Sequence, residues 1–236
     1  MLKVINVAVI AAAGRGERMG LGGGKQYILL GGKPILAHTL QVFEDCTPIH
    51  QVIVVANPED IEFCRDEIIE KYGLSKVLEV VAGGPKRQDS VYNGLQALPK
   101  GTTTVMIHDG ARPLVTPQII EKAISALKGW DGVVVGVPAT DTIKEVQDER
   151  IARTRPRAKL WCAQTPQVFK LKSLFEAHKQ AKSDNFYGTD DAILLERMGY
   201  RIRMIMGSYE NIKITTPEDL LIAEAILRKR QNESEG

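Results

Sequence analysis

The chain has 236 residues, 44% hydrophobic and 25% charged, which is the composition of an ordinary globular protein with room for one sizeable domain. Its 31 basic and 29 acidic residues leave a net charge of +2, which excludes a protein that coats nucleic acid or a membrane surface through bulk charge. Three cysteines without metal-ligand spacing (Cys46, Cys64 and Cys162) predict ordinary buried thiols in a reduced, cytoplasmic compartment.

The first residues resemble a signal peptide, because Lys3 precedes an apolar run. The charged region is thin, however, and the run ends in a glycine-rich loop, so we expect a buried first strand at residues 4–10. No run approaches the ~18 apolar residues that a membrane span requires. We therefore expect neither a membrane nor nucleic acid as a partner.

Short apolar runs that do not alternate with polar residues follow along the chain, as is typical of strands buried on both faces of a sheet. They occupy residues 4–10, 51–56, 76–81, 103–107 and 132–137. Helical patterns separate them and continue after them, at residues 34–43, 59–72, 91–98, 118–127, 172–182, 190–198 and 217–229. This rhythm predicts an α/β, Rossmann-like fold, with a mainly parallel sheet and helices on both faces. Residues 230–236 lack periodicity and are expected to fray.

Residues 138–160 break this rhythm. Two short strands, at 142–146 and 151–154, are joined by a polar turn and predict a β-hairpin with little to bury. We therefore expect a single domain, residues 1–236, from which this hairpin protrudes as an arm that packs on a second copy in a homodimer.

A glycine-rich stretch, AVIAAAGRGERMGLGGGKQY at residues 8–27, follows the first strand. A Walker A loop is excluded because Gln26 follows Lys25, and a dinucleotide fingerprint is excluded because Met19 stands where its third glycine belongs. Backbone N–H groups near Gly14 could approach a polyphosphate, with charge supplied by Arg18 and Lys25. A solvated surface loop would have a similar sequence, so this stretch alone leaves both readings open.

The stretch HDGARP places Asp109 and Arg112 at the end of an apolar strand. A carboxylate at this point suits Mg²⁺, a hard cation held by one or two carboxylates and by substrate phosphates. An Asp-Gly turn is the structural alternative. His108 is expected to be a structural residue rather than a base.

Seven stretches occur in a fixed order and carry a family resemblance: AAAGRGERMG…KQY, GGPKRQDSV, HDGARP, PATDTIK, AQTPQ, TDD and NIKIT. With them the chain resembles, over essentially its whole length, the cytidylyltransferases that act on 2-C-methyl-D-erythritol 4-phosphate. The resemblance implies that an acceptor phosphate attacks the α-phosphorus of CTP with no covalent intermediate. The products would be 4-diphosphocytidyl-2-C-methylerythritol and pyrophosphate, in non-mevalonate isoprenoid synthesis.

The resemblance also implies a set of site residues, with Mg²⁺ as the cofactor, held by Asp109. Nucleotide-binding positions would be Ala12, Ala13, Gly14, Gly16, Gly84 and Ser90. Catalytic cations would be Arg18, Lys25 and Lys213. Acceptor-binding positions would be Asp109, Arg112, Thr142, Arg157, Thr165 and Thr189. Turn or helix capping is the structural alternative for Thr142 and Thr189.

Some features depart from the family pattern or carry a structural alternative. Pro85 has no backbone N–H, so it cannot donate to cytosine. The family often has proline before Lys25, so Gly24 is expected to loosen residues 22–24 in the absence of ligand. Lys213 lies in a strand-like run, where it could face outward as an ordinary surface lysine or equally, with apolar residues on either side, face the site. The methionines Met198, Met204 and Met206 are expected to pack in the interior.

Two alternative functions remain open from the sequence. A ribitol 5-phosphate cytidylyltransferase shares most of the pattern, although HDGARP and RQDSV resemble the methylerythritol branch better. A non-catalytic nucleotide-binding protein on the same fold is the other alternative. The cations around the α-phosphorus disfavour it, because binding alone does not need them.

Overall fold

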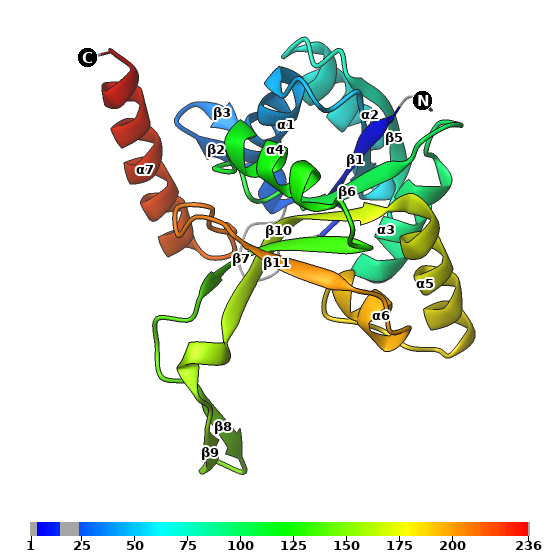
Figure 1. Ribbon diagram of the computed structural model, residues 1–236. Helices are drawn as coiled ribbons and strands as arrows, with labels where there is room; N and C mark the ends of the chain where they lie inside the picture. Colours follow the sequence, from blue (N-terminus) through cyan, green and yellow to red (C-terminus); the bar gives the residue numbers. More distant parts are fainter. Residues whose placement is uncertain (1–3, 15–23, 236) are drawn as a thin grey trace.

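The structure is a computed structural model that describes residues 4–14 and 24–235. Its centre is a seven-stranded sheet with strand order β11-β7-β10-β6-β1-β4-β5 (Figure 1). The strands are β1 (Asn6–Ala12), β4 (Gln51–Ala56), β5 (Val77–Ala82), β6 (Thr104–Asp109), β7 (Gly132–Pro138), β10 (Trp161–Lys170) and β11 (Ile202–Met206). Only β10 runs antiparallel to its neighbours in this described sheet, so the expected mainly parallel α/β fold is confirmed.

Helices cover both faces of the sheet (Figure 1). One face packs against α1 (Ile35–Asp45) and α4 (Pro117–Ala126), and the other against α3 (Arg87–Gln96), α5 (Leu171–Ser183) and α6 (Ala192–Arg197). Strand β1 shows why its sequence is continuously apolar. Ala8 and Ile10 belong to the first core cluster, while Val7 and Val9 belong to the second.

Two strands of the central sheet, β10 and β11, were not expected from the sequence. Strand β10 lies between β6 and β7, although it contains a proline and polar residues that usually argue against a central strand. Its register against β7 shifts between Ala163 and Gln167, which accommodates Pro166 in the ladder. The polar side chains Gln164 and Gln167 are buried and form hydrogen bonds to Ser208 and Asp190, respectively.

Several local expectations are wrong. The expected helix at residues 59–72 is helical over residues 58–70, but it is not one regular α-helix: a 3₁₀ turn (Pro58–Asp60) is followed by the short α2 (Ile61–Phe63) and a π-helix (Cys64–Glu70). Residues 211–215 form no strand. Met198, Met204 and Met206 are 40%, 41% and 46% exposed, because β11 is an edge strand and Met198 follows α6. Cys46 and Cys64 are buried, whereas Cys162 is exposed.

The C-terminal helix α7 (Pro217–Glu235) continues beyond Lys229, where the sequence suggested fraying. Its extension is supported by Lys229 and Arg230, which both pair with Glu210 in the preceding loop. Its first half packs on a small cluster beside two further strands, β2 (Leu29–Leu30) and β3 (Lys33–Pro34). No helix in the described ranges is both long and apolar enough to cross a membrane.

The expected arm is a two-stranded hairpin, β8 (Lys144–Gln147) and β9 (Arg150–Thr154), which projects away from the sheet (Figure 1). Its two-residue turn, Asp148 and Glu149, has φ values of 48° and 62°, as the tight turns that match strand twist require. Val146 and Ile151 face each other across the hairpin and are 60% and 64% exposed.

Candidate active site

A cavity of about 260 Å³ lies at the carboxyl edge of the sheet, where β1, β5 and β6 end. In α/β sheets this edge is where ligands bind. Its described lining comprises Ala11, Ala12, Ala13, Gly14, Lys25, Gln26, Gly84, Pro85, Lys86, Arg87, Ser90, Asp109, Ala111 and Lys213. A second hollow of about 550 Å³ shares Ala13, Gly14, Gly84 and Pro85 with it and extends toward Asn57. We call the first hollow the edge cavity.

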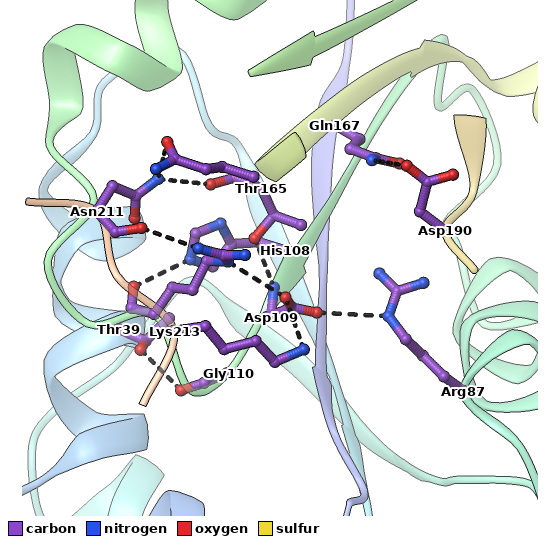
Figure 2. A network of polar contacts seen from close by, with 12 residues as sticks. Thr39, Arg87, His108, Asp109, Gly110, Thr165, Gln167, Asp190, Asn211 and Lys213 are labelled. Carbon is purple, nitrogen blue, oxygen red and sulfur yellow. Dashed lines mark hydrogen bonds and ion pairs between the residues drawn. The ribbon is translucent and has the colours of Figure 1, made fainter. Parts of the chain in front are cut away.

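Asp109 is the last residue of β6 and is the buried centre of a cluster of cations (Figure 2). One carboxylate oxygen, Oδ2, lies 3.0 Å from Lys213 Nζ and 3.3 Å from Arg112 Nε, and the other, Oδ1, lies 3.4 Å from Arg87 Nε. Burial alone would raise the pKa of Asp109, but the three cations outweigh it and hold that pKa well below its usual range. Asp109 is therefore a carboxylate at any physiological pH.

The residues around Asp109 are held by a hydrogen-bond network from distant parts of the chain (Figure 2). The backbone N–H of Asp109 donates to Thr165 Oγ1 at 3.1 Å. Asn211 Nδ2 donates to the Thr165 carbonyl at 2.9 Å, and Arg112 Nη1 donates to the Asn211 carbonyl at 2.9 Å. This network brings β6, β10 and the loop that carries Lys213 together.

Lys213 reaches the site without belonging to a strand. Ile214 donates its N–H to the Ala111 carbonyl at 2.9 Å and is fully buried. Ile212 and Ile214 both pack in the small apolar cluster against which the first half of α7 lies, while Lys213 between them pairs with Asp109. Of the two orientations that the sequence left open for Lys213, the one toward the site is present, although the expected strand is absent.

Arg87 is a site residue that the sequence did not assign. Its guanidinium lies between two carboxylates, Asp109 and the fully buried Asp191, whose Oδ2 is 2.8 Å from Nη1. The other oxygen of Asp191 is 3.2 Å from Nε2 of the buried His178. Burial would raise the pKa of Asp191, but Arg87 and the His178 hydrogen bond lower it overall. Arg87 and Asp191 occur in the quoted stretches GGPKRQDSV and TDD, but 104 residues separate them.

The turn between β5 and α3 is shaped by close backbone approach. A Cβ at Gly83 would lie 2.4 Å from Ala13 Cβ, so only glycine lets this turn meet the end of β1. The Gly84 N–H donates to Ser90 Oγ at 3.0 Å, and that hydroxyl lies 3.1 Å from the Lys86 carbonyl. We call residues 83–86 the β5–α3 turn.

His108 has the surroundings of a structural residue. It is fully buried, its ring packs on Phe43, and Nε2 lies 3.2 Å from the Arg112 carbonyl. Burial lowers the pKa of His108 to about 4, so the ring is neutral near pH 7. A neutral Nε2–H that donates to Arg112 helps to orient the residue that contacts Asp109.

The expected site residues fall into four groups. Those that line the edge cavity are Ala12, Ala13, Gly14, Lys25, Gly84, Ser90, Asp109 and Lys213. Arg112 and Thr165 contact Asp109 directly. Gly16 and Arg18 lie outside the described residues, as do Gly22 and Gly23 in the expected loose stretch.

Three expected acceptor residues are not among the described residues that line the edge cavity: Thr142, Arg157 and Thr189. Thr142 and Arg157 are exposed residues at the base of the arm, where Arg157 Nη1 donates to the Thr140 carbonyl. Thr189 is exposed in the loop between α5 and α6.

Comparisons with known proteins agree over nearly the whole chain. The family described as 2-C-methyl-D-erythritol 4-phosphate cytidylyltransferase matches residues 6–229. Proteins of that name from Geobacter metallireducens and Clostridioides difficile are each 48% identical to it; the alignments cover 94% and 95% of this chain and 97% and 94% of theirs.

Solved structures give the same result. The crystal structure of a 4-diphosphocytidyl-2C-methyl-D-erythritol synthase from Anaerococcus prevotii superposes with a TM-score of 0.85 and 32% identity, covering 95% of this chain and 96% of that one. The 2-C-methyl-D-erythritol 4-phosphate cytidylyltransferase of Thermus thermophilus superposes with a TM-score of 0.77 and 31% identity, covering 93% and 98%.

Proposed function

We propose the roles of this site from one premise: the chain belongs to the family of 2-C-methyl-D-erythritol 4-phosphate cytidylyltransferases. It is a cytidylyltransferase of isoprenoid precursor synthesis, which transfers CMP from CTP to the acceptor polyol phosphate and releases pyrophosphate. In our proposal the edge cavity receives the triphosphate and the adjoining hollow receives the nucleoside.

One observation carries this assignment of the cavity. Its described lining has four cationic side chains, Lys25, Lys86, Arg87 and Lys213, against a single carboxylate, Asp109. A chain with a net charge of only +2 thus concentrates positive charge at one sheet edge. Such a cavity attracts a polyanion, and lysine and arginine are the residues suited to phosphate oxygens.

The reaction in this proposal is an in-line displacement. A phosphate oxygen of the acceptor forms a bond to the α-phosphorus of CTP while the bond to the β-phosphate bridging oxygen breaks, and pyrophosphate leaves with the electron pair. The attacking phosphate is already an anion and needs no base, which agrees with the low pKa of His108. Catalysis then consists of positioning and charge stabilisation by Lys25 and Lys213, with Arg18 on the outer phosphates.

The donor groups present fit Mg²⁺ bound together with the nucleotide. Asp109 offers one ionised carboxylate, and the described residues contain no cluster of three or more histidine, cysteine or acidic residues able to hold a metal. A metal held by one carboxylate and by substrate phosphates is the usual mode for Mg²⁺. When bound, the ion would neutralise charge on the triphosphate. Because three cations already surround Asp109, the metal would bind poorly without the nucleotide's negative charge.

The acceptor would lie on the other side of the α-phosphate. We assign it Arg112, Thr165 and Thr189 from the main body, and Thr142 and Arg157 from the arm. The backbone of Gly84, which lines both hollows, would face the nucleoside, with the Ser90 hydroxyl on the edge-cavity side of it and no donor at Pro85.

We further propose that the enzyme is a homodimer in the cytoplasm. The arm supports the first part, since Val146 and Ile151 form an exposed apolar pair on a hairpin with no core of its own. The cysteines, all within the described residues, support the second, since all three are free thiols.

Pyrophosphate release tests the proposal. The purified enzyme would be assayed with CTP and Mg²⁺, using 2-C-methyl-D-erythritol 4-phosphate in one series and ribitol 5-phosphate in another. We expect rapid release with the first acceptor only. Rapid release with ribitol phosphate would keep the mechanism and change the substrate, and no release with either would contradict the assigned chemistry.

A variant links the same assay to the cavity. Lys25→Ala is expected to lower turnover by roughly 10²–10³-fold, as removal of a transition-state donor does. Lys100→Ala, which removes a lysine that does not line the edge cavity, is the control. An unchanged rate in Lys25→Ala would remove the proposed role of the glycine-rich stretch.

A further inference from the structure

Gln88 uses both ends of its side-chain amide to hold a segment far along the chain. Nε2 donates to the Phe186 carbonyl at 3.0 Å, and Oε1 accepts the Gly188 N–H at 2.9 Å, across 98 and 100 residues. Gln88 lies in the first turn of α3, directly after the β5–α3 turn. Two bonds to one segment fix its position as well as its distance from the helix. We call residues 186–191 the acceptor segment.

The far end of the acceptor segment is held separately. Gln167 Nε2 donates to Asp190 Oδ2 at 2.8 Å (Figure 2), and Arg87 Nη1 pairs with Asp191 at 2.8 Å. Thr189 therefore lies between Gly188, which Gln88 holds, and Asp190, which Gln167 holds. Its backbone is restrained from both sides.

The acceptor segment also has little room to move toward α6. A Cβ at Gly188 would lie 2.4 Å from Ile193 Cγ2 and 2.9 Å from the Asp190 carbonyl oxygen. Lys86 Nζ of the β5–α3 turn lies 3.3 Å from the centre of the Tyr187 ring. Residues 186–190 are neither helix nor strand, so these side-chain contacts define where the segment sits.

We infer that Gln88 is a positioning residue that sets Thr189 relative to the nucleotide half of the site. The inference rests on the proposed function, in which the β5–α3 turn meets CTP and Thr189 meets the acceptor. Gln88 is not among the described residues that line the edge cavity, so it acts through the acceptor segment. Loss of its amide would leave CTP binding intact and would release Thr189 on one side.

Two variants separate the effect of the Gln88 hydrogen bonds from the effect of the volume of its side chain. Gln88→Met keeps the length and helix preference of the side chain but loses both bonds, and Gln88→Ala removes the chain beyond Cβ. We expect the acceptor KM to rise roughly tenfold in both variants, as the loss of two neutral hydrogen bonds permits, with the KM for CTP changed less than twofold. Asn93→Ala is the matched control, because Asn93 lies on the same helix but bonds to Ala82 instead.

A second measurement needs no substrate. Amide exchange of Gly188, followed by NMR in the ligand-free enzyme, should be at least tenfold faster in both Gln88 variants and unchanged in Asn93→Ala. The inference is overturned if Gly188 exchange is unchanged, if the acceptor KM is unchanged, or if the KM for CTP rises equally. If the wild-type enzyme fails to turn over either acceptor, the proposed function fails, whereas Gly188 exchange still reports on whether Gln88 holds the segment.

Discussion

Lys213 and Asp109 form an ion pair of 3.0 Å, although 104 residues separate them in the chain and Lys213 belongs to no strand. Asp109 is buried, whereas the Lys213 side chain is 34% exposed toward the edge cavity. The carboxylate thus holds a partly solvated ammonium at the point where phosphate charge is expected. A preformed cation of this kind needs little reorganisation when charge develops in the reaction.

Replacement of this ammonium should act on the chemical step. Lys213→Ala is expected to lower kcat by roughly 10²–10³-fold, because a donor aimed at the developing charge is lost. The fold should survive, since Asp109 keeps Arg87 and Arg112 as partners. Steady-state pyrophosphate release, together with a thermal melt, measures both effects.

Lys229→Ala provides the comparison for Lys213→Ala. Lys229 is an exposed lysine of α7 that pairs with Glu210, so its removal should leave kcat within twofold. A Lys213→Ala enzyme that also retained its kcat within about threefold would show that the ammonium has no role in the transition state.

Much of the fold and part of the site follow from local sequence. The continuous apolar run of β1 predicts a strand buried on both faces, and its residues divide between the two core clusters. The stretch HDGARP places a carboxylate directly after a strand, and Asp109 is found at the edge cavity. These two features can be predicted because each depends only on residues that are adjacent in the chain.

Other features depend on partners that the sequence does not reveal. Arg87 gains its role only because Asp191, 104 residues later, is buried against it. The sequence does not indicate strand β10, because a proline and two glutamines are unusual in a central strand. In the structure Gln164 donates a hydrogen bond to the Ser208 carbonyl, and Gln167 donates one to Asp190. Residue propensities do not reveal such contacts, because the contacts form only in the folded chain.

The buried His108 should make the free energy of unfolding depend on pH between 6.5 and 4. Burial lowers the pKa of His108 to about 4 from the ordinary 6.5, so the unfolded chain binds more protons in this window and stability falls as the pH falls. The difference corresponds to about 3 kcal/mol. Urea unfolding of the wild type and of His108→Gln, compared from pH 7 to pH 4, should show a steeper slope in the wild type. His38, whose pKa burial also lowers, keeps its own part of the slope in both proteins.

His50→Gln is the control for this slope, because His50 is exposed and its replacement removes one histidine without opening the core. Parallel pH dependences of the wild type and His108→Gln would contradict the assignment of the slope to His108.

The Asp191 carboxylate, which lies between Arg87 and His178, should stabilise the folded state at neutral pH and lose this stabilising effect in acid. The pKa of Asp191 is lowered in the folded state, so its stabilisation is complete above the unfolded value near 4 and is lost as the pH falls through the folded value. Asp191→Asn is expected to lower the free energy of unfolding by about 2–3 kcal/mol at pH 7, since it leaves Arg87 short of one buried partner. The deficit relative to wild type should shrink below pH 4.

Asp184→Asn is the matched surface change. Asp184 pairs with Arg197, where the two side chains are 34% and 40% exposed, so its removal should cost at most about 1 kcal/mol. A deficit in Asp191→Asn that stayed constant from pH 7 to pH 2.5 would show that packing, and not the charge, accounts for it.

The arm should decide the oligomeric state. Val146 and Ile151 are cross-strand partners that are more than half exposed, so each would become buried if a second copy packed on the hairpin. Replacement of both by aspartate should raise the dimer dissociation constant by at least roughly 100-fold, because two apolar contacts are lost and two charges would be buried. Sedimentation velocity over a concentration series measures the dissociation constant directly.

Leu78→Asp is the control for the arm variant. Leu78 is an exposed apolar residue on β5, an edge strand of the central sheet, so this change should leave the dissociation constant unchanged. A wild-type monomer, or a dimer that survives in the arm variant, would show that this surface does not hold the two copies together.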